Sequence, residues 1–301
     1  MTQRYDISFL CQPRDILGES PVWDSARDLL YWVDIRRSLL HVFSTAANTH
    51  DERTLGPELL TGVVLAQPDA LVIGRPHALE HIGTGVDTFA SPLVDFSFLP
   101  TVNRTNEIKT DPRGRIWTGA MWDYARGCSG GLYRVEVNGQ PTCVRQNVRV
   151  PNSLAFSPDG KWMYFADTAT GAIERAPYDE ETGAVGTWHE LIGASTAPGK
   201  PDGLAIDTQG CLWSARFGAG QIVRFTPDGR IDRTIDLPVT RPTSCAFGGA
   251  DMQTLFVTTA TQGLSVDQQV NEPLAGALLA VATQTTGLAV GRAVLPGSIS
   301  T

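Results

Sequence analysis

The sequence of 301 residues lacks several features that would place it in common functional classes. Its five cysteines are odd in number and form no CxxC pair, which favours neither a disulfide scaffold nor a zinc site. Basic residues are few: 24 Lys and Arg against 32 Asp and Glu leave a net charge of −8 with no basic cluster, so we expect no binding to nucleic acid. No apolar run approaches the ~20 residues of a membrane span, and the apolar stretch of MTQRYDISFLCQPRD is too short for a secretory signal. We therefore expect a cytoplasmic protein that does not bind membranes.

Sequence motifs of several enzyme classes are missing as well. There is no GxSxG motif, which argues against a serine esterase of the α/β-hydrolase fold. The sequence holds no HExxH motif, which argues against a zinc protease. GAGQIVRF and GTGVDTF hold too few glycines for nucleotide-binding loops.

Glycine and proline are abundant, with 30 and 19 residues, and this favours a turn-rich, strand-rich fold. A polar turn followed by a short apolar strand recurs along the chain, as in DSARDLLYWVDI and SPDGKWMYFADT. Copies of this first signal occupy 24–35, 67–76, 111–121, 157–168, 207–217 and 249–260. A second strand, with alternating apolar and polar positions, follows each copy at 38–43, 78–83, 131–137, 172–178, 221–227 and 277–283.

Six copies of a two-part strand signal, spaced by about 45 residues, predict an all-β, six-bladed β-propeller with four strands in each blade. We expect YDISFL at 5–10 to supply an outer strand that closes the ring with the last blade. No linker divides the chain, so residues 1–301 are predicted to form one domain. A β-sandwich or a jelly roll is the alternative, but neither explains the period.

Polar residues at the same place in several repeats are candidates for a central site, because the loops that enter the inner strands of a propeller converge at one mouth of its channel. Three stand out: Glu19 in LGESPVW, Asn152 in VPNSLAFSPDG and Asp202 in KPDGLAIDTQG. The equivalent places elsewhere hold Asn106 or Glu107, and Thr243 or Ser244. Two carboxylates and an amide oxygen suit Ca²⁺, Mg²⁺ or Mn²⁺ and can hold Zn²⁺. Each residue alone could instead cap a strand or a turn.

Five other aspartates precede strands in Pro-Asp-Gly-like turns, where Asp commonly caps the turn. We interpret all five as structural: Asp24, Asp111, Asp159, Asp207 and Asp228.

The motifs around the central candidates carry a family resemblance. The chain resembles the family of gluconolactonase, regucalcin (senescence marker protein) and luciferin-regenerating enzyme in LGESPVWD at 17–24, NRTNEIKTDPRGRIWTGAM at 103–121, GLYRV at 131–135, VPNSLAFSPDGKWMYFADT at 150–168, KPDGLAIDTQGCLWSARFGAGQIVRF at 200–225 and LPVTRPTSCAFGG at 237–249. These motifs run in the family's order over most of the chain. The resemblance implies the same six-bladed propeller.

The resemblance also implies roles for individual residues. One divalent metal, with its identity open among Ca, Zn, Mn and Mg, would be held by Glu19, Asn152 and Asp202. Arg104 and Asn106 match positions that face the substrate. The acidic substrate-binding residue of animal members would fall at Tyr124, with Asp123 preceding it, and this departure concerns the substrate preference.

The resulting hypothesis is a metal-dependent sugar lactonase that opens an aldonolactone to the aldonic acid. The metal would polarise the carbonyl and activate a water, and Asp202 would act as general base. Arg104 would bind hydroxyls or the developing oxyanion, and Asn106 would bind hydroxyls. The alternatives are a phosphotriesterase-like hydrolase and a propeller that binds a metal or a protein without catalysis. We expect a small sugar lactone as the partner, and a monomer or weak homodimer.

Overall fold

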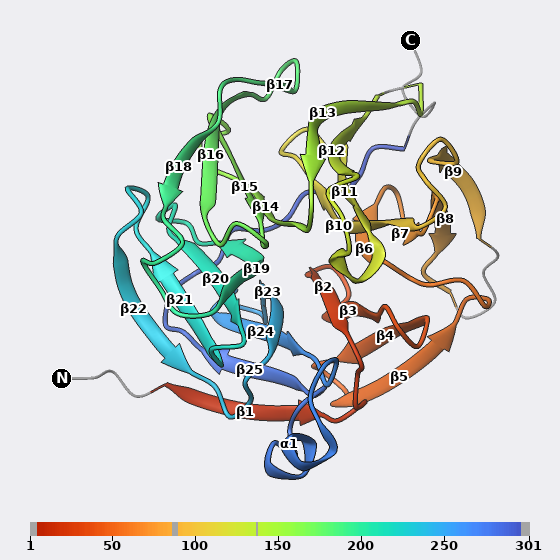
Figure 1. Ribbon diagram of the computed structural model, residues 1–301. Coiled ribbons are helices and arrows are strands. Elements are labelled where there is room, and N and C mark those ends of the chain that lie inside the picture. Colours follow the sequence, from red (N-terminus) through yellow and green to blue (C-terminus); the bar gives the residue numbers. More distant parts are fainter. Residues whose placement is uncertain (1–4, 86–89, 137, 296–301) are drawn as a thin grey trace.

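The computed structural model describes residues 5–85, 90–136 and 138–295. Within these ranges, strands gather into six antiparallel sheets arranged as blades around a central channel (Figure 1). Blade 1 holds β2 (Gly18–Asp24), β3 (Leu29–Asp34), β4 (Leu39–Ser44) and β5 (Thr49–Thr54), and blade 2 holds β6 (Gly62–Ala66), β7 (Ala70–Arg75), β8 (Ala78–Gly83) and β9 (Ser91–Asp95). Blade 3 holds β10 (Asn103–Thr110), β11 (Ile116–Trp122), β12 (Gly130–Val135) and β13 (Pro141–Val148).

The second half of the ring repeats this arrangement. Blade 4 holds β14 (Pro151–Phe156), β15 (Trp162–Asp167), β16 (Ile173–Asp179) and β18 (His189–Ile192), with the short β17 (Ala184–Val185) also paired to β16. Blade 5 holds β19 (Lys200–Ile206), β20 (Leu212–Phe217), β21 (Gln221–Phe225) and β22 (Ile231–Asp236). Blade 6 holds β23 (Pro242–Gly248), β24 (Thr254–Thr259), β25 (Leu278–Ala282) and β1 (Asp6–Cys11). The predicted six-bladed propeller is thus confirmed.

The first strand of the chain closes the ring, as the sequence predicts. β1 pairs antiparallel with β25, with Ile7 opposite Val281 and Phe9 opposite Leu279 (Figure 1). Because the outer strand of blade 6 comes from the other end of the chain, the first and last blades are held together by main-chain hydrogen bonds. The two repeated strand signals are the two middle strands of each blade, β3 and β4 in blade 1 and their equivalents elsewhere.

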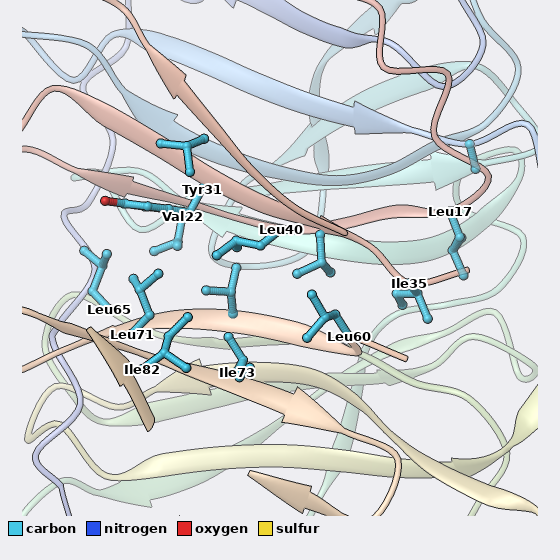
Figure 2. Close-up of a cluster of buried hydrophobic side chains, with 14 residues drawn as sticks. Leu17, Val22, Tyr31, Ile35, Leu40, Leu60, Leu65, Leu71, Ile73 and Ile82 are labelled. Carbon is cyan, nitrogen blue, oxygen red and sulfur yellow. The ribbon is translucent and has the colours of Figure 1, made fainter. Parts of the chain in front are cut away.

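Apolar side chains of neighbouring blades pack against each other and form the core between them. Between blades 1 and 2, Val22, Tyr31 and Leu40 meet Leu71 and Ile73, all at most 6% exposed (Figure 2). The first of the two middle strands in a blade, such as β3 or β7, is buried on both faces, which explains its nearly unbroken apolar sequence. The ring of such contacts fixes the inner strands around the channel.

The two ends of the channel differ. We call the end at which the inner strands begin the upper mouth, and the end at which they finish the lower mouth. Residues 284–295 cross the lower mouth, with bridges Asp207–Gly287 and Ala66–Ala293 to blades 5 and 2. They cover a cavity of about 330 Å³ whose lining includes Lys109, Trp23 and Phe247. The segment has no strand periodicity, and the sequence alone did not indicate it.

The turn aspartates are structural in two different ways. Asp207 is fully buried, and its carboxylate accepts hydrogen bonds from Trp213 Nε1 (2.9 Å) and Arg224 Nε (2.8 Å). Asp111 repeats this contact in blade 3 with Trp117 Nε1 (3.3 Å). Asp228, in contrast, is exposed and accepts a hydrogen bond from Thr226 in its own turn. The buried members tie a turn to the middle strands of a blade.

Replacing Asp207 by Ala should destabilise the protein strongly, because Arg224 is only 3% exposed and would lose its buried partner. We expect a loss of about 3–5 kcal/mol in the free energy of unfolding, measured by urea denaturation. Asp228→Ala is the matched control in an exposed turn and should unfold near the wild-type midpoint. Equal stability of the two variants would contradict the structural interpretation of Asp207.

Candidate functional site

The candidate residues lie at irregularities of the inner strands. In the described chain, pairing of the inner strand with the next strand shifts register in five blades, for example after Glu19 in blade 1 and after Asn152 in blade 4. Blade 2 is regular there. Ser20, Glu107 and Ser153 adopt positive φ values of 52°, 48° and 55° at these points. A bulge turns side chains away from their regular alternation, so it directs polar groups into the channel mouth.

Hydrogen bonds between neighbouring inner strands hold these irregular segments in place. Ser153 Oγ donates to the carbonyl of Asp202 (2.5 Å), and Asn106 Nδ2 donates to the carbonyl of Pro151 (2.8 Å). Thr243 Oγ1 donates to the carbonyl of Gly18 (2.5 Å), which joins the last blade to the first. Each bond joins two blades, so the side chains at the upper mouth sit on a rigid frame.

Three carboxyl groups face one another in this frame. Asp202 is 7% exposed, and its buried Oδ1 has no hydrogen-bond partner among the described residues. Burial, and then the charges of Glu19 and Glu107, raise the pKa of Asp202 well above its usual value. Burial likewise raises the pKa of Glu19 and of Glu107 to about 7, against the lowering effect of Lys109. Lys109 Nζ lies 3.8 Å from Glu107 Oε1, whereas Glu19 and Asp202 form no ion pair among the described residues, so the buried carboxyl groups outnumber the cation beside them.

Asn152 is fixed next to these carboxyl groups. Its Nδ2 donates to Thr168 Oγ1 (2.9 Å), and Thr168 in turn donates to the carbonyl of Pro201, the residue before Asp202. Its Oδ1 accepts a hydrogen bond from Asn106 Nδ2 (3.0 Å). A carbonyl oxygen has two lone pairs, so one remains for a cation. Glu19, Asn152 and Asp202 therefore offer oxygen ligands that fit a divalent metal, and Glu107 adds a further carboxylate.

Arg104 lies beside this group and is only 4% exposed. Its Nη1 donates to Asn106 Oδ1 (2.7 Å) and to the carbonyl of Thr105 (3.0 Å), while its Nε donates to Asp123 Oδ1 (2.8 Å). Burial lowers the pKa of Arg104, and Asp123 opposes that effect. Nη2 takes part in no hydrogen bond among the described residues, so one edge of the guanidinium is free to meet a ligand.

Asp123 and Tyr124 occupy different positions at the rim of the upper mouth, in the 3-10 turn Asp123–Ala125. Asp123 accepts two hydrogen bonds from Arg36, both 2.8 Å long, besides that from Arg104. Partial burial raises the pKa of Asp123, but these guanidinium contacts outweigh it and hold the pKa at about 2. Tyr124 is 58% exposed, and its ring centre lies 3.9 Å from Arg36 Cζ. Arg36 and Arg104 thus both bind the Asp123 carboxylate, and the Tyr124 ring packs over Arg36.

Two contacts at this site could not be predicted from the sequence. Glu107 is predicted only as an alternative to Asn106, because the bulge at this point changes which side chains face the channel. In the structure both face the site: Asn106 contacts Asn152, and Glu107 accepts a hydrogen bond from the backbone of Leu154 (3.1 Å). Arg36 lies in a turn of another blade, with no motif to mark it.

The sequence is similar to a protein family and to individual lactonases over most of its length. The sequence profile of the SMP-30/gluconolactonase/LRE-like region matches residues 17–261. A 6-deoxy-6-sulfogluconolactonase of Pseudomonas putida is 33% identical over 275 residues, which cover 91% of this chain and 94% of that protein. A pentonolactonase of Haloferax volcanii is 35% identical over 244 residues, 81% of each chain.

Solved structures agree with the fold. The crystal structure of a calcium-binding protein, regucalcin, from Agrobacterium tumefaciens superposes with a TM-score of 0.92 at 27% identity, over 97% of this chain and 98% of that one. A luciferin-regenerating enzyme superposes with a TM-score of 0.90 at 24% identity, over 97% of this chain and 100% of that one, and shows the fold alone.

A six-bladed propeller with a polar, carboxylate-lined mouth, matched by lactonases over most of its length, defines an enzyme of the lactone-hydrolase class, which cleaves carboxylic esters. The chain belongs to the SMP-30/gluconolactonase/LRE-like family. In its described part, no helix is long and apolar enough to cross a membrane.

The raised pKa values predict how stability of the metal-free protein depends on pH. The pKa of Glu107 is about 7 in the folded protein, because of burial, and 4.5 in the unfolded chain, so between these values the folded state binds more protons than the unfolded state. Its contribution to stability is therefore lost as pH rises from about 5 to about 8. We expect the free energy of unfolding of the wild type, relative to Glu107→Gln, to fall over this range in urea titrations with EDTA. A difference that is constant or rises with pH would contradict the assignment.

Proposed function

We propose that the protein is a divalent-metal-dependent hydrolase that opens a sugar lactone, of the aldonolactone type, to the sugar acid. The observation that carries the proposal is the buried, unpartnered Oδ1 of Asp202 beside the carboxyl groups of Glu19 and Glu107. A divalent cation held by Glu19, Asn152 and Asp202 would neutralise these charges with the ligand type that hard cations prefer. When bound, the cation supplies Lewis acidity toward the ester carbonyl and lowers the pKa of water. Its identity among Ca²⁺, Zn²⁺, Mn²⁺ and Mg²⁺ is open.

Asp202 is the proposed general base. Its buried Oδ1 has no hydrogen-bond partner among the described residues and can accept the proton of the attacking water, while its main chain is held by Ser153. The general base contributes about 10²–10⁴-fold to the rate in enzymes of this kind. The fixed position of Asp202 means that the proton acceptor needs no rearrangement during the reaction.

Arg104 and Asn106 are the proposed substrate contacts. The free edge of the Arg104 guanidinium can bind a sugar hydroxyl or the oxygen that becomes negative as the lactone opens. Asn106 fixes that guanidinium through its Oδ1 and contacts Asn152 through its Nδ2. Asp123 is a positioning residue, because its oxygens are engaged by Arg104 and Arg36. Tyr124 lies at the entrance, where an exposed ring can contact a bound sugar.

The polar character of the mouth favours a lactone over the phosphotriester alternative, which would fit a more apolar pocket. The names of the relatives, gluconolactonase and pentonolactonase among them, support a sugar lactone as well. A non-catalytic propeller would leave the free edge of Arg104 without a role. That the protein is cytoplasmic, and a monomer or weak homodimer, stays a prediction.

Lactone hydrolysis should depend on a divalent metal and on Asp202. We expect proton release from a panel of aldonolactones to drop to the spontaneous rate in EDTA and to return with Mg²⁺, Mn²⁺, Ca²⁺ or Zn²⁺. Asp202→Asn should lose about 10²–10⁴-fold in kcat. Asp236→Asn, which changes an exposed carboxylate of the same blade, is the matched control and should retain full activity. Background hydrolysis of every lactone by metal-loaded wild type would overturn the proposal.

Asp123 should act through Arg104. Asp123→Asn replaces charge-assisted hydrogen bonds worth about 1.5–3 kcal/mol with weaker ones, so kcat/KM should fall by about 10–100-fold. Asp236→Asn, which changes an exposed carboxylate outside the upper mouth, is again the control and should match the wild type. Steady-state kinetics in which Asp123→Asn matches the wild type would show that Arg104 does not need this partner.

A further inference from the structure

A second group of ligand-type side chains lies on the outer strands of blade 1, away from the channel. His41 Nδ1 on β4 is 3.0 Å from His50 Nε2 on β5, and 3.8 Å from Glu52 Oε1 on the same strand. The ligand atoms of all three residues lie within 4.8 Å of one another. No residue of this group contributes to the upper mouth, so the mechanism proposed above leaves it without a role.

The inner histidine of the group is oriented by a buried carboxylate. His41 is fully buried, and its second ring nitrogen, Nε2, lies 3.0 Å from Asp15 Oδ1. Asp15 is in turn held by Trp32, whose Nε1 donates to Asp15 Oδ2 (2.9 Å). The Trp32 ring also stacks on both imidazoles, with ring centres 4.7 Å from His41 and 5.2 Å from His50. A carboxylate at this position commonly stands behind a metal-bound histidine. In the metal-free protein the 3.0 Å contact between His41 Nε2 and Asp15 Oδ1 does not have hydrogen-bond geometry.

The spacing of the three donors suits a tetrahedral transition metal. Ligands that bind Zn²⁺ at 2.0–2.1 Å are about 3.3 Å apart in tetrahedral geometry, and the two separations of 3.0 and 3.8 Å lie on either side of this value. Glu52 has a 38% exposed side chain, which leaves a path from solvent. Arg37, 3.3 Å from Glu52 Oε2, contacts the other carboxylate oxygen.

We propose that His41, His50 and Glu52 bind one transition-metal ion of the zinc type, with Asp15 as the residue that orients His41. Two imidazole nitrogens and one carboxylate oxygen favour Zn²⁺ over Ca²⁺ or Mg²⁺, which prefer all-oxygen sites. In the metal-free protein the His41–His50 hydrogen bond occupies the place of the ion. This site is independent of the proposed lactonase activity.

The position of the group gives the ion a structural role. Asp15 lies on the connection between β1 and β2, where the chain passes from blade 6 to blade 1. Its backbone N–H donates to the carbonyl of Gly276, and its carbonyl accepts a hydrogen bond from the backbone of Thr261, both in blade 6. A metal that fixes His41 against Asp15 therefore strengthens the junction at which the ring closes, and binding to the folded state alone raises its stability.

The test measures zinc binding in a protein whose central site is weakened. Asp202→Asn protein, freed of metal by chelation, is titrated with Zn²⁺ by calorimetry, and the same background is combined with His50→Gln or with His189→Gln. His189 is exposed on β18 of blade 4 and controls for binding by surface histidines. We expect one equivalent of zinc to bind the His189→Gln protein, and on the order of 100-fold weaker binding by the His50→Gln protein.

A second readout separates the site from a folding defect. Zinc should raise the Tm of the Asp202→Asn and His189→Gln proteins but not that of the His50→Gln protein, while circular dichroism shows all three folded. Ca²⁺ should leave these differences unchanged. Equal zinc affinity of the His50→Gln and His189→Gln proteins, or no zinc binding by folded Asp202→Asn protein, would overturn the proposal, whatever the lactonase assay shows.

Discussion

The arrangement of the upper mouth depends on the burial of several carboxyl groups close together. Burial raises the pKa of Asp202, Glu19 and Glu107, and repulsion by neighbouring carboxylates raises the pKa of Asp202 and of Glu107 further. Isolated charges of one sign are costly in such a place unless a cation joins them. Arg104 reduces the repulsion only in part, because Asp123 already binds its Nε. The unmet charge of the site is therefore the physical basis of the proposed metal site.

The rest of the propeller supplies the rigidity that this crowding requires. Apolar side chains between blades fix the inner strands, and buried aspartates such as Asp207 tie the turns to the middle strands. β1 and β25 join the two ends of the ring. Residues 284–295 cover the lower mouth through bridges to blades 2 and 5. The closed ring fixes the inner strands, so the carboxyl groups at the upper mouth stay close together although their charges repel.

The sequence alone predicted the ring more fully than the site. The period of the strand signals gave the six blades, and the shared frames around Asn152 and Asp202 marked equivalent inner strands. That both Asn106 and Glu107 face the site could not be predicted, because the bulge at this point breaks the regular alternation of side chains along β10. His41 and His50 showed no metal-ligand spacing, since they meet across paired strands rather than along a helix. Their partner Asp15 comes from a loop, where no periodicity applies.

The central claim is that the carboxyl groups at the upper mouth hold a divalent cation. Anomalous X-ray diffraction from crystals grown with Mn²⁺ tests it most directly, because the ion itself is located. We expect one strong peak in the channel, from an ion bound to oxygens of Glu19, Asn152 and Asp202. A map with no peak there, from crystals in which the three side chains are well ordered and ionised, would contradict it.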